Sequence, residues 1–137
     1  MTLGALIDLG LPVEELQGLL PSLGLAGVSL TARRVTKQHL TGVKVEIEAG
    51  GQQPARTYRE ICALIEAAPL AETAKARSLT AFRLLGEVEA RIHGQPLETV
   101  HFHELGALDT IVDVVGVAHG LEYLGVSRVF CSPLPMG

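Results

Sequence analysis

Hydrophobic residues recur at the spacing of an amphipathic helix in several parts of the chain. One such stripe follows Pro12, and a second follows Thr57 and Glu60, which match a capping box. The longest stripe is predicted to form one buried helix face with Phe82, Leu85, Val88 and Ile92. We therefore predict helices over residues 3–9, after residue 12, from residue 57 to the stop at residue 69, over residues 72–93 and over residues 108–124.

In residues 28–49 the hydrophobic period changes to two. The alternation over residues 28–32 and 43–47 predicts a pair of half-buried antiparallel strands, with the turn within residues 37–42 and around His39. The phase slips at Val35, which faces outward unless a bulge adds one residue to the first strand. We therefore predict a β-hairpin, with a bulge as the way to return Val35 to the buried face.

The helix over residues 108–124 is apolar on nearly every side, which predicts that it is buried in the middle of the domain. Gly125 ends this helix, and residues 126–131 are predicted to form a further strand that joins the hairpin. The predicted fold class is α+β: a small mixed sheet with an antiparallel hairpin, helices packed on it and one central buried helix. Residues 1–137 are expected to form a single domain.

The composition is typical of a folded protein, since 47% of the residues are hydrophobic and 19% are charged. A net charge of -4, with no basic cluster beyond Arg33 and Arg34, argues against nucleic acid and anionic membranes as partners. Apolar runs are too short for a membrane span and no signal-peptide pattern is present, so a cytoplasmic location is expected. Small molecules, metals or proteins are the expected partners. The oligomeric state, a homo-oligomer included, is left open.

Candidate chemistry gathers in residues 100–113, where histidines and acids interrupt an aliphatic sequence. In an extended backbone, His101 and His103 share one face, while Phe102 points the other way and anchors the stretch in the core. The two imidazoles form half of a metal site, to which Glu104 or acids of the following helix can add carboxylates. Such a ligand set suits zinc, nickel, iron or manganese better than magnesium or calcium.

Asp109 and Asp113 lie one turn apart on the same side of the predicted helix, and Gly116 and Gly120 continue that side. The glycines predict the close approach of another helix or of a ligand. Asp109 has an equally good structural explanation in the capping and dipole effects at a helix start. Asp113, inside an apolar helix, is expected to be paired, to be coordinated or to face a cavity.

Taken together, these motifs closely resemble the LarC family of nickel insertion proteins. The resemblance covers nearly the whole chain and is carried by residues 1–10, 90–94, 100–116, 121–126 and 132–137. It implies that the full-length protein inserts nickel into a pyridinium bisthiocarboxylate mononucleotide, using CTP, to make the nickel-pincer cofactor of lactate racemase and related enzymes. Nickel, CTP and a pyridinium-type nucleotide substrate are thus the ligands that the resemblance implies.

On this resemblance, His101, His103 and Glu104 are expected to hold the metal. Imidazole and carboxylate ligands release Ni(II) more readily than a thiolate cage does, as a protein that passes the metal on requires. Asp109 and Asp113 are expected to support these ligands or to act as general bases.

The sequence departs from the family pattern in two respects. Residues 50–54 stand where family members usually carry a histidine-rich run, which puts metal storage by this loop in question. The first strand of the family and its C-terminal domain, which is associated with CTP binding, are not in the sequence. The chain is therefore expected to be a fragment of a longer protein, and its activity alone is in question.

A different class of function stays open on these residues. An HxH pair is a weak metal motif by itself, and the same polar side chains can form a structural hydrogen-bond network. In that case the chain is a scaffold or assembly domain, and the metal and nucleotide chemistry lies elsewhere in the longer protein. A metal-dependent hydrolase is disfavoured, because the ligand set is incomplete.

Overall fold

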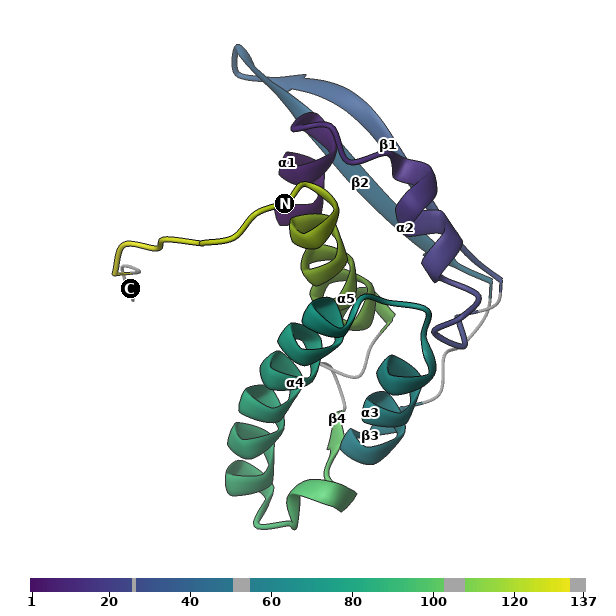
Figure 1. Cartoon of the computed structure of the whole chain (residues 1–137), viewed down its shortest axis with the longest axis vertical. Coiled ribbons are helices and arrows are strands. Elements are labelled where there is room, and N and C mark those ends of the chain that lie inside the picture. The colour runs from purple at the N-terminus through teal and green to yellow at the C-terminus, as the bar shows by residue number, and fades with distance from the viewer. Residues whose placement is uncertain (26, 51–54, 103–107, 134–137) are drawn as a thin grey trace.

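The computed structural model describes residues 1–25, 27–50, 55–102 and 108–133. Figure 1 shows a long hairpin and two short helices on one side of a central helix, with two further helices on the other. In chain order the elements are α1 (Thr2–Asp8), α2 (Val13–Leu19), β1 (Val28–Lys37), β2 (Leu40–Ala49), β3 (Arg56–Thr57), α3 (Tyr58–Ala67), α4 (Glu72–His93), the 3-10 helix η1 (Leu97–Thr99), β4 (His101–Phe102) and α5 (Leu108–Tyr123).

The hairpin is confirmed, and it is more regular than predicted. β1 and β2 pair antiparallel without interruption along their full lengths. Gln38 and His39 form the turn with positive φ angles of 48° and 68°, as a type I′ turn with matching twist requires. The bulge is therefore absent, and Val35 stays on the outer face, opposite Gly42.

The α+β class is confirmed, but the strands form separate sheets. The hairpin is one two-stranded sheet, and β3 with β4 is another. The strand predicted over residues 126–131 is wrong, because these residues leave the end of α5 as an extended trace that belongs to no strand (Figure 1). A strand needs a neighbour with unpaired backbone groups, and no strand of the described residues pairs with this segment.

α5 is the central buried helix, as its apolar sequence predicts. Val115 is 0% exposed, and the hairpin side of the helix is covered by α1 and α2. A Cβ atom added at Gly116 would lie 3.0 Å from Leu3 and 3.2 Å from Leu16. Leucines of α1 and of the α1–α2 connection approach Gly120 as closely. Helix packing is therefore confirmed as the reason for the two glycines.

α4 has the predicted bounds, but its predicted buried face is partly wrong. Phe82 is 0% exposed, whereas Val88 is 51% and Ile92 is 69% exposed. The buried stripe continues through Gly86, because a Cβ atom there would lie only 3.4 Å from the ring of Phe102. The buried face of α4 thus combines Phe82 with the small residues Ala74, Ser78 and Gly86, whereas Val88 and Ile92 face outward. Neither α4 nor any other helix in the described ranges is long and apolar enough to cross a membrane.

Candidate metal-binding site

The first predicted ligand, His101, is positioned by the aromatic residue that follows it. His101 and Phe102 form β4, in which successive side chains point to opposite faces. His101 is exposed, whereas Phe102 is 0% exposed and packs edge-on against Phe82, with ring centroids 6.1 Å apart and planes at 69°. The predicted alternation is therefore confirmed for these two residues. Phe102 anchors the strand, and His101 is held at the surface.

A carboxylate that the sequence analysis did not connect with the site lies near His101. Thr57 in β3 pairs with His101 in β4. The Glu60 Oε2 atom accepts hydrogen bonds from Thr57 N at 2.7 Å and from Thr57 Oγ1 at 2.8 Å, while Glu60 N donates to Thr57 Oγ1 at 3.3 Å. The capping box is thus confirmed, and its carboxylate is held beside the residue opposite His101.

The pKa of Glu60 reflects this arrangement. The backbone and side-chain hydrogen bonds from Thr57 lower the pKa of the Glu60 carboxyl from its ordinary value, and the charge of His101 adds a smaller contribution in the same direction. The capping motif is visible in the sequence, but its proximity to His101 depends on the pairing of β3 with β4. Two-residue strands carry no periodicity from which that pairing could be predicted.

The two predicted acids lie at the start of α5 and face the same space. Asp109 and Asp113 are both exposed and line a cavity of about 200 Å³. The rest of its wall is apolar and is formed by Met1, by Leu3 of α1, and by Val45 and Ile47 of β2. Of the three expectations for Asp113, facing a cavity is confirmed. Because both carboxylates reach solvent, neither requires a buried partner.

A larger cleft of about 680 Å³ begins on the other side of Asp113. Its wall is mainly apolar, with Val114, Val117 and Leu121 of α5 facing Val126, Ser127 and Val129. The other charged residue of the wall, Arg77, pairs with Glu122 at 3.3 Å and donates to the carbonyl oxygen of Val126 at 3.5 Å. This size is typical of a small-molecule or peptide site. The cleft is formed by segments far apart in the sequence, so no local motif predicts it.

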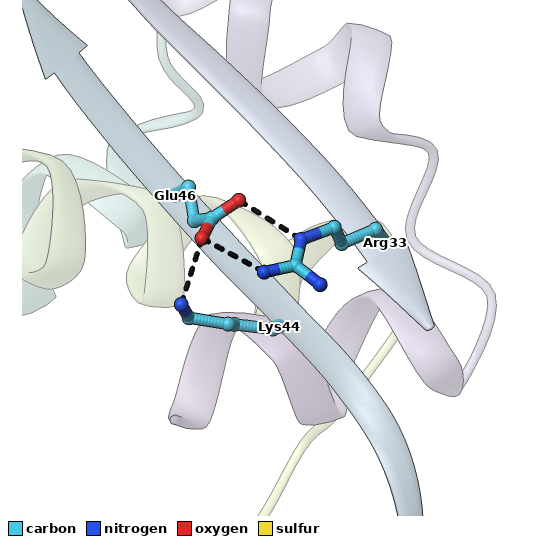
Figure 2. A network of polar contacts seen from close by, with 3 residues as sticks. All are labelled: Arg33, Lys44 and Glu46. Carbon is cyan, nitrogen blue, oxygen red and sulfur yellow. Dashed lines mark hydrogen bonds and ion pairs between the residues drawn. The ribbon is translucent and has the colours of Figure 1, made fainter. Parts of the chain in front are cut away.

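A charged cluster on the hairpin is self-contained and lies on the outer polar face (Figure 2). Arg33 Nε donates to Glu46 Oε2 at 3.0 Å, Arg33 Nη2 donates to Glu46 Oε1 at 3.1 Å, and Lys44 Nζ donates to Glu46 Oε1 at 2.7 Å. Hydrogen bonds from Arg33, followed by those from Lys44, lower the pKa of Glu46 to about 2. A carboxylate that already accepts hydrogen bonds from two cationic side chains is a poor metal ligand. We therefore interpret this cluster as a solvated surface network.

Two further histidines have carboxylate partners outside the predicted site. His119 Nε2 of α5 lies 3.4 Å from Glu15 Oε2 of α2, and His93 Nε2 lies 3.2 Å from Glu89 Oε2 near the end of α4. The first pair links two elements, whereas the second joins neighbouring turns of one helix. Both contacts are explained by the packing and capping of the helices.

Comparison with known families shows to which family the chain belongs. The model of the family described as nickel insertion protein matches residues 1–137. The chain belongs to the nickel insertion protein family.

The curated relatives of this chain are considerably longer. A protein of Thermomicrobium roseum named "Putative nickel insertion protein" is 49% identical over 137 residues, which cover 99% of the chain and 34% of the relative. Proteins of the same name from Syntrophobacter fumaroxidans and from Synechococcus sp. are 46% and 49% identical, with 35% of each relative covered. The chain thus spans about a third of the length of these relatives. No solved structure matches it.

The structure brings the predicted site residues only partly together. Asp109 and Asp113 share one cavity, while His101 lies on the β3–β4 sheet. His103 and Glu104 fall outside the described residues. Within the described ranges, no three His, Cys, Asp or Glu side chains are grouped to hold a metal ion. The ligand set of His101, His103 and Glu104 therefore stays a prediction.

Proposed function

We propose that residues 1–137 form the nickel-handling part of a nickel insertase. The full-length protein inserts Ni(II) into a pyridinium bisthiocarboxylate mononucleotide. It uses CTP in this reaction, and the product is the nickel-pincer cofactor of lactate racemase-type enzymes. The observation that carries this proposal is the family match along the entire chain. Nickel is the cargo of the reaction, so the site must bind the ion and then release it.

The proposed nickel ligands are His101, His103 and Glu104. Imidazole nitrogen and carboxylate oxygen bind Ni(II) without the tight retention of a thiolate cage. The exposed position of His101, on a strand anchored by buried Phe102, supports this role, because an ion in transit needs an accessible ligand on a rigid support. Ligands on such a support need little rearrangement when nickel arrives or leaves.

Asp109 and Asp113 have the proposed role of assisting proton transfer and ligand orientation. The carboxylate that orients a metal-bound imidazole raises its basicity, and an exposed carboxylate beside a substrate can accept a proton. Both aspartates are exposed and line one cavity at the start of α5, which supports a shared role in handling substrate. Metal binding by the histidines and proton handling by the aspartates are separable by mutation.

The decisive experiment compares full-length variants in nickel insertion and in calorimetric titration with Ni(II). We expect His101→Ala with His103→Ala to abolish nickel binding at micromolar metal and to stop insertion. His39→Asn is the matched control, since this histidine lies in the hairpin turn at a φ of 68°, which asparagine tolerates. Unchanged nickel insertion in the double variant would remove these histidines from the mechanism.

The same titration distinguishes the scaffold alternative. If the full-length protein binds nickel equally well with and without His101 and His103, the chemistry lies in the remaining two thirds of the polypeptide. Residues 1–137 would then serve to assemble or orient that part. Asp109→Asn with Asp113→Asn should leave nickel binding measurable while slowing insertion, and loss of binding in this pair would instead make the aspartates ligands.

A further inference from the structure

The segment that follows α5 has the properties of a strand without a partner. Residues 126–131 are extended (Figure 1), and their sequence alone predicts a strand. Val126 N donates to the carbonyl oxygen of Leu121 at 2.9 Å, but within the described ranges the amides of residues 127–131 have no backbone acceptor. Val129 is 70% exposed and Phe130 is 84% exposed. Apolar side chains and unpaired amides thus lie together on one short segment.

The same segment forms one wall of the large cleft. Val126, Ser127 and Val129 face Val117 and Leu121 of α5 across a space of about 680 Å³. The space is large enough for several side chains. Contiguous exposed apolar surface of this kind marks a binding surface in stable proteins, because leaving it in water is unfavourable. The cleft and the unpaired segment therefore require one occupant that offers both a backbone edge and apolar side chains.

The length of the relatives indicates where this occupant comes from. The chain accounts for only 34% of the Thermomicrobium roseum protein and 35% of the Syntrophobacter fumaroxidans protein. A strand in the same polypeptide binds without the entropy cost of bringing two molecules together, and at a high effective concentration. A strand from a second molecule would have to offset the entropy cost of association with the contacts of one short segment.

We propose that the part of the full-length protein outside residues 1–137 contributes a β-strand that pairs with residues 126–131 and places apolar side chains in the cleft. The added strand satisfies the unpaired amides and covers Val129 and Phe130. It also explains why a segment with a strand-like sequence forms no strand among the described residues. This inference does not depend on nickel or on the proposed ligands.

Hydrogen exchange measured by mass spectrometry on the full-length protein tests the proposal. We expect the amides of residues 127–131 to exchange at least about 100-fold more slowly than an unstructured peptide of the same sequence, independently of protein concentration. Exchange at the unstructured rate overturns the proposal. Protection that appears only as the concentration rises also overturns it, because a second copy would then be the occupant.

A pair of variants provides an independent test in the full-length protein. Phe130→Asp should lower the Tm by about 4 °C or more, because it places a charge against the added strand. Leu40→Asp is the matched control, since Leu40 is 79% exposed at the hairpin turn and lies on another part of the molecule. Equal, small effects of the two substitutions would mean that Phe130 stays in water in the full-length protein, which contradicts the proposal.

Discussion

Thr57 and His101 lie directly opposite each other in the β3–β4 pair. Thr57 is also the N-cap of α3, and both its backbone N–H and its hydroxyl donate to the Glu60 carboxylate. The cap that starts α3 is therefore part of the same two-residue sheet that presents the first proposed nickel ligand. A substitution that loosens the cap should also loosen the support of His101.

Removing the Thr57 side chain should destabilise the protein measurably. Thr57→Ala loses a confirmed capping box, for which we expect about 1 kcal/mol of lost unfolding free energy in a urea titration. Thr80→Ala is the control, because the Thr80 hydroxyl donates to the carbonyl oxygen of Ala76 within α4 and caps no helix end. Equal losses in the two variants would show that the cap contributes nothing specific.

The acid sensitivity of folding should depend on Glu46. Its pKa is lowered from 4.5 to about 2 by Arg33 and Lys44, and a carboxyl with a lower pKa in the folded protein stabilises it above the unfolded value. This stabilisation is complete above about pH 4.5 and is lost as the pH falls toward 2. The free energy of unfolding, measured between pH 4.5 and pH 2, should fall less steeply with decreasing pH in Glu46→Gln than in the parent protein.

The control for this experiment is Glu48→Gln, an exposed position two residues along the same strand. Because the Glu46 network is exposed, its contribution should be small and should shrink at high salt. If the unfolding free energy depends on acid pH in the same way in the parent, Glu46→Gln and Glu48→Gln proteins, the network does not influence stability.

Two helical glycines should respond in opposite directions to alanine. A Cβ atom at Gly4 would collide with the carbonyl oxygen of Val43, which belongs to β2 and cannot move aside as a side chain does. We expect Gly4→Ala to cost about 2 kcal/mol or more in unfolding free energy. Gly18→Ala meets nothing within 4 Å and should be stabilising by up to about 1 kcal/mol. Similar effects at both positions would contradict the packing of α1 against β2.

The contact between Phe82 and Phe102 should be measurable in a double-mutant cycle. The rings meet edge to face at 6.1 Å, and both side chains are 0% exposed. Changing each to leucine, singly and together, should give a coupling energy of about 0.5–1.5 kcal/mol in chemical denaturation. Strict additivity would mean that Phe102 anchors β4 only through its volume.

Local sequence signals predicted much of the fold. The capping box of Thr57 and Glu60, the bounds of α4 and the β1–β2 hairpin all depend on residues close together in the chain, and all are confirmed. The same is true of α5. Its sequence is apolar on nearly every side, which predicted a buried central helix, and most of its apolar residues are buried.

The errors come from features that depend on neighbours. Val88 and Ile92 have the spacing of a buried face, but the buried face of α4 continues from Phe82 to Gly86 instead. At Val35 the alternation left two options, a bulge or an outward-facing side chain, and only the regular pairing of the hairpin decides for the second. The segment after α5 has strand propensity and no strand beside it among the described residues.

The candidate site was predicted less completely than the fold. His101 and Phe102 point to opposite faces because strand geometry alone requires it, so this part was predictable. The common cavity of Asp109 and Asp113 includes residues of α1 and β2, and the position of Glu60 near His101 depends on the β3–β4 pair. Such relationships arise from tertiary packing, which a single sequence does not display.

Asp113 borders both the cavity of about 200 Å³ and the cleft of about 680 Å³. Its carboxylate, together with Met1, is thus part of the wall of both spaces. Any charge that enters one of them changes the electrostatic potential in the other, and thermodynamic linkage makes this influence equal in both directions. A charged group that enters the cleft would thereby adjust how strongly the smaller cavity attracts a cation, whereas an apolar side chain would not.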